Sequence, residues 1–324
     1  MGLLALAFGI AWFAPSSSYL LLPDEAKPLA DLVEVEGERP NDEGGIYYVD
    51  VVVRKASLLE EQIGALRPEG ADVVPEHAIV PPGSSFQERR QRNLAAMDLS
   101  QQIAAAVALR ELGYEVDSEP EGARVVAVAG DAPAAGKLEA SDVIVAVDGD
   151  EVRTPDDLRR LIARRDVGET VSLRVRSGER TRTVDVGTIA SPDDADRPIV
   201  GIQVEQFAEI DVPIDVEIDL GNVGGPSAGL AFALDVVEEL RGDVDGGYRV
   251  AATGELRLDG SVAPVGGVAQ KTIGARRAQA DVFLVPAGDN AATARENADG
   301  LRVIPVETFQ QALRALTTLP ARAS

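Results

Sequence analysis

One stretch of the sequence, residues 118–191, carries a complete set of secondary-structure signals and constrains the fold more than any other feature. Apolar, β-branched runs at 124–128 and 142–147 predict two strands, and the second run ends in an Asp-Gly pair that accepts a positive φ in a tight turn. Because a helix and a hairpin follow in the same stretch, it can bury a core of its own. We therefore expect a small separate domain in the middle of the chain.

The helix and the hairpin of this stretch have clear local signals. Thr154 can cap the helix, and Pro155 suits its first position because a proline lacks the N–H that would be unpaired there. Residues 170–176 and 181–186 alternate in polarity on either side of a Ser-Gly-Glu-Arg turn, which predicts an antiparallel hairpin. The middle domain is therefore expected to be mostly β.

Composition limits the chemistry of the chain. Of its 324 residues, 45% are hydrophobic, which is enough for two or three packed units. There is no cysteine, so disulfides, thiolate metal sites and a cysteine nucleophile are excluded, and His77 alone cannot form a multi-histidine metal site. We predict no metal and no other cofactor. The formal net charge of -23 argues against nucleic acid as a partner, because binding phosphates requires clustered Lys and Arg.

An uncharged apolar run at residues 2–14, closed by Pro15, begins the chain. A bilayer core of roughly 30 Å needs about 20 helical residues, so this run alone is too short to span it. It is a signal-peptide core, an anchor extended through residues 19–22, or an anchor shortened by a misplaced start codon, and a buried helix is the alternative. We expect an uncleaved single-pass membrane anchor over residues 1–22, with the remainder outside the cytoplasm.

Strand and helix signals flank the middle domain on both sides. An aromatic and β-branched run at 46–53 predicts one strand. Strong helix formers up to residue 112, followed by Gly113, predict a helix that begins between Phe86 and Ser100. Residues 212–220 alternate in polarity and predict a half-buried strand before a helix that begins at Pro226.

Ser227 and Lys271 are the strongest candidates for catalytic residues. Ser227 lies in a Gly-Pro-Ser-Ala-Gly run at a helix start, and Lys271 follows a Gly-Gly-Val-Ala-Gln run. A serine hydroxyl needs a base to take its proton, and a desolvated lysine can be that base. The lysine pKa must fall from about 10.4 to between 7 and 8, which costs the charged form about 4 kcal/mol. On local sequence alone, a capping serine and a solvated lysine remain the alternatives.

Three motifs at 225–229, 252–256 and 264–271 resemble, in order and spacing, the proteolytic domain of the Lon protease family. The resemblance implies that Ser227 is the nucleophile, that Lys271 is its general base and that the Thr253 hydroxyl helps hold the lysine. It also implies that Gly225 and Pro226 support the nucleophile turn.

Of two acidic positions in the family, this chain matches one and lacks the other. Asp42 falls where the family carries an acidic neighbour of the active site, although a loop aspartate is the alternative interpretation. Cytoplasmic Lon has an aspartate three residues before its serine, where this chain has Gly224. Any charge or hydrogen bond that this aspartate provides is therefore absent at this position.

The element order of the middle stretch, with its Ala-Pro-Ala-Ala-Gly run at 132–136, resembles a bacterial PDZ domain. PDZ domains bind an extended peptide end by adding it as a strand to a sheet edge. The resemblance implies that the loop and receiving strand are residues 122–126, with a plain structural insert as the alternative. These candidate peptide-binding residues are Gly122, Ala123, Arg124, Val125 and Val126, and Arg124 is otherwise a solvated strand charge.

Taken together, these segments predict a mixed α/β (α+β) fold in which a Lon-like proteolytic domain is split by an inserted PDZ-like domain. The expected divisions are an anchor at 1–22, the first Lon-like part at 23–117, the PDZ-like domain at 118–195 and the second Lon-like part at 196–324. This order resembles the membrane-tethered PDZ-Lon peptidases of bacteria. The resemblance implies a serine endopeptidase in the cell membrane that cleaves unfolded polypeptides through a Ser-Lys dyad.

ATP dependence is not expected, because the sequence contains no Gly-x4-Gly-Lys-Ser/Thr phosphate loop. The family resemblance also suggests a homo-oligomeric ring, which we treat as a hypothesis. Two other functions stay open. One is a tethered PDZ adaptor on an inactive Lon-like fold, and the other is an acyl hydrolase or self-processing protein that uses the same dyad.

Overall fold

The structure, a computed structural model, divides the chain into two compact units, which we describe separately. The inserted unit comprises Asp117–Asp211, and the outer unit comprises Met1–Val116 with Val212–Ser324. The residues that the structure describes are 12, 14–30, 32–35, 45–79, 86–178, 180–192, 194–214, 216–218, 220, 221, 223–242 and 244–320.

The inserted unit is built on an antiparallel sheet whose strands lie in the order β11-β10-β8-β7-β14. Helix α5 (Pro155–Ile162) is capped by Thr154, whose side chain accepts the N–H of Asp157 at 3.1 Å, so the predicted cap is confirmed. A further pair, β12 (Ile189–Ser191) with β13 (Asp194–Ile199), forms a small second sheet. The strands of the main sheet are β7 (Asp117–Val128), β8 (Val143–Val147), β10 (Thr170–Ser177), β11 (Arg180–Gly187) and β14 (Ile202–Asp211), and β9 (Asp150–Glu151) pairs with β8.

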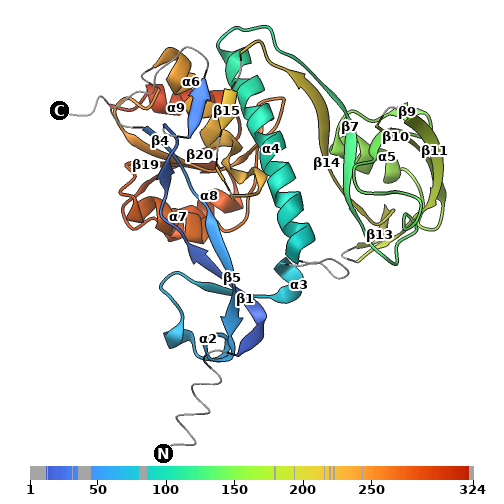
Figure 1. Cartoon of the computed structure of the whole chain (residues 1–324), viewed down its shortest axis with the longest axis horizontal. Coiled ribbons are helices and arrows are strands. Elements are labelled where there is room, and N and C mark those ends of the chain that lie inside the picture. The colour runs from blue at the N-terminus through green and yellow to red at the C-terminus, as the bar shows by residue number, and fades with distance from the viewer. Residues whose placement is uncertain are drawn as a thin grey trace, which may run out of the picture. The chain divides into compact units, whose positions relative to one another are not determined.

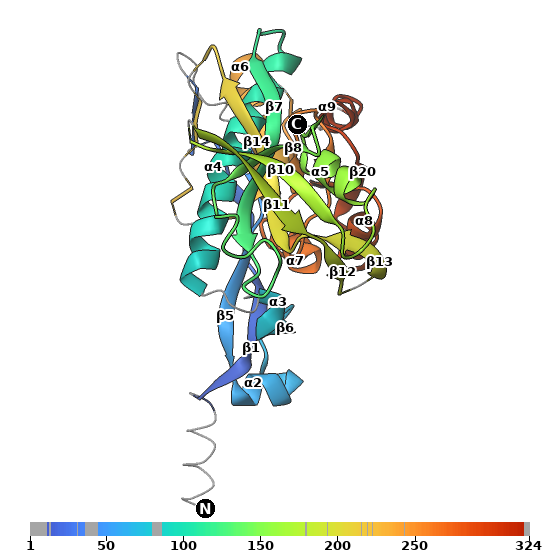
Figure 2. The same cartoon turned by 90° about the vertical axis from the view of Figure 1, so that its right-hand side faces the viewer.

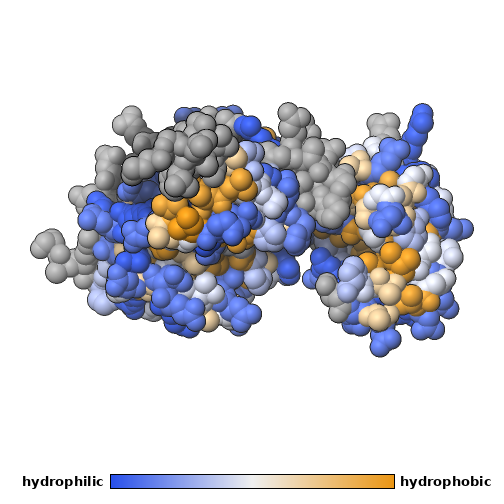
Figure 3. Space-filling view, turned by 90° about the horizontal axis from the view of Figure 1, so that it is seen from below, coloured by the Kyte–Doolittle hydropathy of each residue, from blue (hydrophilic) through white to orange (hydrophobic). Residues whose placement is uncertain are grey.

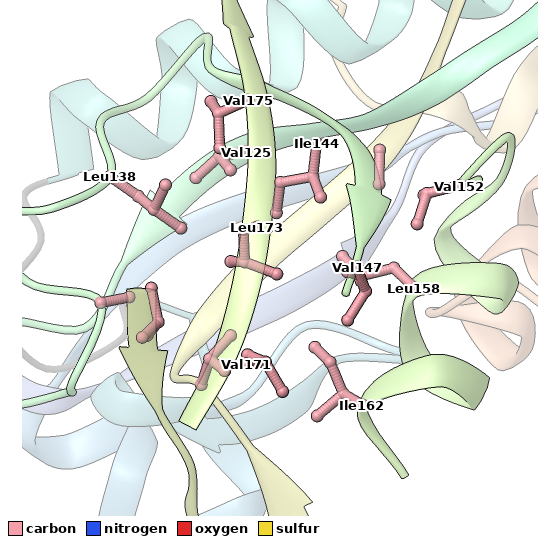
Figure 4. Close-up of a cluster of buried hydrophobic side chains, with 14 of the residues drawn as sticks. Val125, Leu138, Ile144, Val147, Val152, Leu158, Ile162, Val171, Leu173 and Val175 are labelled. Atoms are coloured by element: carbon pink, nitrogen blue, oxygen red, sulfur yellow. The ribbon is translucent and has the colours of Figure 1, made fainter. Parts of the chain in front are cut away.

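The core of the inserted unit lies between this sheet and α5. Every second residue of β10 points inward, so Val171, Leu173 and Val175 are fully buried. Leu158 and Ile162 from α5 pack against the same cluster (Figure 4). The predicted strands, helix and hairpin of this region are therefore confirmed. The alternation of apolar and polar residues along the strands accounts for their packing.

The inserted unit continues past residue 195, where the sequence analysis placed its end. Strand β14 pairs with β7 along its whole length, from Ile202 opposite Val128 to Asp211 opposite Asp117. Because this ladder ties β14 to the inserted unit, the unit ends at Asp211. The polarity of β14 gives no sign of which unit it pairs with, and the boundary was misplaced for that reason.

The outer unit contains a five-stranded sheet in the order β2-β4-β16-β19-β20, in which all pairs except β2 with β4 are parallel. The Val-Phe-Leu-Val-Pro run of β19 is wholly buried, as expected of a central parallel strand. Helices lie around this sheet in Figure 1. The strands are β2 (Lys27–Pro28), β4 (Gly45–Tyr48), β16 (Arg249–Ala252), β19 (Val282–Pro286) and β20 (Arg302–Val306), and the helices are α6 (Gly229–Arg241), α7 (Val268–Arg277), α8 (Asp289–Glu296) and α9 (Phe309–Thr317).

The long helix α4 (Phe86–Glu111) packs along α6 and is the teal helix of Figures 1 and 2. In its alanine-rich second half, residues 103–109 are buried and Ala104, Ala106 and Ala108 completely so, and these small side chains allow close helix packing. The predicted helix before Gly113 is confirmed. Among the described residues of the strand predicted at 212–220, β15 (Val216–Ile218) is the part that pairs, with β3 (Val33–Val35).

A second sheet of the outer unit corrects two expectations. Strand β1 (Pro15–Pro23) lies between β5 (Val51–Ser57) and β6 (Asp72–Pro75), so an anchor that extends through residue 22 is wrong. The single strand expected at 46–53 is divided into β4 and β5, which belong to different sheets. The remaining elements are α2 (Leu58–Gln62), η1 (Gly64–Leu66), α3 (Glu76–Ile79), β17 (Glu255–Leu256) and β18 (Val262–Ala263).

The apolar run at the start of the chain lies outside the described residues, except for Trp12 and residue 14. Within the described ranges, no helix combines the length and the apolar character that crossing a bilayer requires. On the face shown in Figure 3, hydrophilic residues cover much of both units, in keeping with the high net charge, and apolar residues gather in smaller patches. The predicted mixed α/β fold class is confirmed.

Candidate active site

Ser227 lies in the short 3-10 turn η2 (Pro226–Ala228) that leads into α6. Gly225 caps this turn with a φ of +106°, a conformation that favours glycine. Helix α4 fixes the turn from one side, because the N–H of Gly225 donates to the carbonyl of Asn93 at 2.8 Å and the Ser100 hydroxyl donates to the carbonyl of Pro226 at 3.2 Å. The sequence around Ser227 therefore folds into a turn held by backbone bonds.

Thr253 connects the serine turn to the lysine. It follows β16, is completely buried, and its hydroxyl donates to the carbonyl of Ser227 at 3.0 Å. The same hydroxyl accepts a hydrogen bond from the Lys271 amine at 3.1 Å. The N–H of Gly254 also donates to the Ser227 carbonyl, at 2.8 Å. The structure thus brings Ser227, Thr253 and Lys271 together, as the sequence analysis expected from the family resemblance.

Lys271 lies on α7, and only 3% of its surface is exposed. Burial lowers the pKa of its amine to about 8, and the negative charge of Asp50 opposes this shift. A pKa near 8 leaves a substantial neutral fraction in mildly alkaline solution, which a general base requires. In this structure the amine donates to Thr253 rather than to the Ser227 hydroxyl, and hydrogen bonds of catalytic groups often tighten only when substrate binds.

Ser227 and Lys271 line one cavity of about 580 Å³ in the outer unit. Residues from β1, β5, α4 and the segment before η2 supply an apolar lining. Its polar groups include Asp50 and Arg90. The apolar lining residues include Leu21, Val51, Val53, Leu94, Met97 and Val223.

Asp50 is a residue of this cavity that the sequence analysis missed. It lies at the break between β4 and β5, and its side chain is 20% exposed. Burial raises the pKa of Asp50, the charge of Lys27 opposes this rise and the charge of Asp24 adds to it. An acidic residue inside the apolar run at 46–53 was the signal that could have identified it, because an unpaired buried charge is costly.

Two other positions were candidates for an acidic group at the site. Asp42, which was expected beside the active site, lies outside the described residues. Gly224 carries no side chain, and a Cβ there would lie 3.0 Å from the Cβ of Asn93 and 3.1 Å from its carbonyl carbon. Within the part of the chain that the structure describes, no three His, Asp or Glu side chains could together hold a metal ion.

The candidate peptide-binding strand of the inserted unit is wrong. Residues 122–126 belong to β7, which pairs with β14 on one side and β8 on the other, so β7 has no free edge there. Arg124 donates to the Glu205 carboxylate at 2.8 Å and lies over the Phe207 ring. Repeated β-branched runs made interior and edge strands indistinguishable in the sequence.

Strand β14 instead lies at the edge of the described sheet. A cavity of about 560 Å³ lies between it and α5. The end of β13 and the two residues that follow it, 197–201, also line this cavity, and Leu158 and Ile162 contribute from α5. The edge of β14, the helix and this segment together form a groove that could hold an extended peptide.

Comparisons with known protein families agree with this geometry. Residues 194–318, which include Ser227, Thr253 and Lys271, match the Lon protease (S16) C-terminal proteolytic domain. Residues 110–188 match the PDZ domain. The chain carries a Lon-type proteolytic domain and a PDZ domain. The outer unit thus holds the matched catalytic motifs, and the inserted unit is the PDZ domain.

Known Lon proteases are similar to part of the chain. The Lon protease of Roseiflexus castenholzii is 39% identical over 106 residues, which cover 32% of this chain and 12% of that protein. Lon protease 2 of Thermus thermophilus is 40% identical over 86 residues, 26% of this chain and 11% of that protein. Lon protease 2 of Bacillus subtilis is 33% identical over 113 residues, 33% of this chain and 20% of that protein. The chain thus spans only a small part of these relatives.

A solved structure is similar to the PDZ region. The PDZ domain of the SdrC-like protein from Listeria innocua is 28% identical, with a TM-score of 0.24, and the match covers 26% of this chain and 92% of that domain.

Proposed function

We propose that this protein is an ATP-independent serine endopeptidase in which Ser227 is the nucleophile and Lys271 the general base. The observation that carries the proposal is the buried amine of Lys271, joined through the Thr253 hydroxyl to the turn that holds Ser227. The match of residues 194–318 to the Lon proteolytic domain supports the reaction class. The sequence has no phosphate loop for ATP, which supports energy-independent cleavage.

The reaction follows from the chemistry of these groups. The neutral Lys271 amine takes the proton of the Ser227 hydroxyl as the oxygen attacks the peptide carbonyl. The resulting ammonium gives its proton to the leaving amine as the peptide C–N bond breaks, which leaves an ester on Ser227. Lys271 then activates a water molecule that hydrolyses the ester. Backbone amides at the η2 turn are suited to donate to the oxyanion of the tetrahedral intermediate.

The cavity favours particular substrates. Its apolar lining can accept an apolar side chain next to the cleaved bond, and β5 is an edge strand of its sheet among the described strands. An extended, unfolded segment can reach such an edge, whereas a folded protein keeps its backbone paired. We therefore propose unfolded or loosely structured polypeptides as substrates.

The PDZ domain is proposed to capture such substrates by a chain end. The groove between β14 and α5 supports this role, because β14 offers an edge and the groove has apolar walls. Binding of labelled apolar peptides by fluorescence anisotropy tests it: a free carboxyl end should bind at least about tenfold more tightly than an amidated end. Replacing Ile202 in the groove wall by Asp should remove the difference, and equal binding of both peptides would contradict the proposal.

Cleavage of fluorescent casein without ATP tests the peptidase itself. Wild type should degrade casein added in trans, whereas Ser227→Ala and Lys271→Ala should lose at least about 10³-fold in rate. Ser172→Ala and Lys137→Ala, both in the PDZ domain and outside the two cavity linings, are matched controls that should retain casein cleavage. Cleavage of the protein's own chain alone would favour self-processing, and absence of any cleavage would favour an adaptor. Membrane attachment and a ring assembly stay predictions.

A further inference from the structure

We infer that Asp50 is a positioning residue for Lys271: its carboxylate directs the lysine amine into the cavity and stabilises the ammonium ion that forms during the reaction. The inference rests on the proposed peptidase function and assigns the negative charge of the site to a residue outside all three Lon-like motifs. Asp50 comes from the break between β4 and β5, whereas the motifs begin at residue 225.

The packing of α4 explains why this charge does not come from position 224. A Cβ at Gly224 would lie 3.0 Å from the Cβ of Asn93, which is closer than side-chain carbons normally approach. The N–H of the next residue, Gly225, is bonded to the carbonyl of Asn93, so the backbone cannot move away without loss of that bond. An aspartate at 224 would therefore require α4 to shift. The chain instead has the carboxylate of Asp50 in the lining of the same cavity.

The start of α7 and the start of β5 touch, which fixes Asp50 near Lys271. Gly267, the cap of α7, has a φ of +69°, and a Cβ there would lie 2.7 Å from Cγ2 of Val51. Lys271 follows one helical turn later, and its N–H donates to the carbonyl of Gly267 at 2.9 Å. Because Asp50 directly precedes Val51, this contact holds both side chains at the same cavity, which they line together.

The two carboxylate oxygens of Asp50 have different surroundings. Oδ2 lies 3.6 Å from the Lys27 amine, whereas Oδ1 is buried and, within the described part of the chain, has no hydrogen-bond partner. Leaving a buried carboxylate oxygen unpaired is costly. A nearby ammonium is the partner that would remove this cost, and the proposed reaction generates one on Lys271.

The charged neighbours of Asp50 leave its carboxylate available to interact with Lys271. Lys27 binds Asp24 at 2.8 Å and lies within reach of Asp50, so one cation is shared between two carboxylates. Tyr48 from β4 and Arg90 from α4 are the other titratable or charged groups near this end of the cavity. The segment of Asp24 and Lys27 is fixed to α7, because the N–H of Ala26 donates to the carbonyl of Gly274 at 3.2 Å.

The role follows from the proton transfer. When the Ser227 proton moves to Lys271, a neutral amine becomes an ammonium ion inside a buried site, which burial disfavours. A fixed carboxylate nearby compensates for this, as the aspartate of a Ser-His-Asp triad does for an imidazolium. Asp50 accepts no proton in this scheme. It acts only through Lys271.

Titration of Lys271 by NMR tests the inference directly, because the chain has only four lysines. The full chain is labelled at lysine Cε, in a Ser227→Ala background, and Lys271→Arg assigns the resonance. Asp50→Asn should lower the pKa of Lys271 by about one unit, since the carboxylate favours the charged amine. Asp50→Glu should restore it. Asp72→Asn is the matched control, because that carboxylate binds the neighbouring Gln270 at 2.7 Å, and it should leave the pKa unchanged.

Kinetics of the active chain give the second measurement. On an unstructured peptide, Asp50→Asn should lower kcat at its alkaline plateau by about 10- to 100-fold, with little change in KM. If Asp50→Asn does not fold, Asp50→Ser serves in both experiments. A lysine pKa that stays unchanged or rises in the neutral variant would overturn the inference, whatever happens to kcat. The absence of cleavage by wild type would refute the peptidase, while the titration would still decide the coupling of Asp50 to Lys271.

Discussion

The proteolytic domain and the PDZ domain use charge in opposite ways. In the PDZ domain, arginines pair with aspartates, as Arg165 does with Asp148 at 2.7 Å at the surface and Arg182 does with the buried Asp142 at 2.7 Å. In the proteolytic domain, Lys271 and Asp235 are almost completely buried. Because burying a charge is costly, charges kept inside a core need a reason, whereas surface pairs need none. Within the described part of the chain, Lys271 and Asp235 make no ion pair, so buried charged groups without an opposite charge distinguish the proteolytic domain from the PDZ domain.

Burial alone does not identify a catalytic group, as Lys271 and Asp235 show. Lys271 lines the cavity, and burial lowers its pKa to about 8. Asp235 lies on α6 away from the cavity lining, and burial, reinforced by the carboxylates of Glu239, Glu238 and Asp245, raises its pKa to about 8. Of these two groups, only Lys271 combines the shift with a place in the cavity that Ser227 also lines.

The largest expected effect that separates the two domains is a loss of stability on substitution in the apolar core of the PDZ domain. Leu173 is fully buried there, so Leu173→Ala should destabilise that domain by about 2–5 kcal/mol. Cleavage of a short unstructured peptide should continue, because the cavity belongs to the other domain. Calorimetry with a parallel peptide assay measures both. If Leu173→Ala abolished peptide cleavage as well as destabilising the PDZ domain, the two domains would not act separately.

The next largest effect should be a loss of activity when the hydrogen bond between Thr253 and Lys271 is removed. Thr253→Val keeps the shape of the buried side chain but cannot accept from Lys271 or donate to Ser227. We expect kcat for peptide cleavage to fall by about 10- to 100-fold, and Thr253→Ser to recover most of it. Steady-state kinetics on one peptide compare wild type, Thr253→Val and Thr253→Ser. If Thr253→Val were as active as wild type, Thr253 would have no role in holding Lys271 for catalysis.

Replacing the buried Asp235 by a neutral residue should affect stability and not catalysis. Because the folded pKa of Asp235 is raised, its contribution to stability is complete below the unfolded pKa of about 4 and is lost as pH rises towards 8. Asp235→Asn should therefore raise Tm at pH 9 by about 2–4 °C, the shift that about 1 kcal/mol produces. At pH 4 the gain should vanish. Thermal scans at both pH values check this, and an equal gain at both would contradict it.

The smallest effect is expected at the surface of the PDZ domain. Arg159 pairs with Asp156 one helical turn earlier, and both side chains are well exposed. Arg159→Ala should change stability by no more than about 0.5 kcal/mol. Denaturant unfolding measures this. A loss several times larger would mean that surface pairs matter in this domain and would weaken the contrast between the two domains.

The sequence predicted elements with strong local signals. Thr154 and Pro155 marked the start of α5, and the polar turn at 177–180 marked a hairpin. The sequence could not predict how strands combine. The acidic residue at position 50 divides one apolar run between two sheets, and β14 belongs to the PDZ domain only through pairing with β7. Such long-range pairing leaves no local signal.

The site was predictable where motif spacing determined it. Ser227, Thr253 and Lys271 were identified from three motifs, and their mutual bonds follow from the fold. Asp50 was not identified, because its distance from Lys271 along the chain is long and only folding brings the two to one cavity. The peptide groove was assigned to β7 because the pairing of β7 with β14 on one side and β8 on the other arises only from folding.

The pH dependence of kcat/KM for cleavage of an unstructured peptide, without ATP, tests the central claim most directly. Wild type and Lys271→Arg are compared, because an arginine stays protonated and cannot act as a base. The account predicts wild-type activity that rises with a midpoint near pH 8, where the Lys271 amine loses its proton, and no activity in the variant. Wild-type activity that is flat from about pH 6 to 10, or an active Lys271→Arg enzyme, would contradict a Ser227–Lys271 dyad.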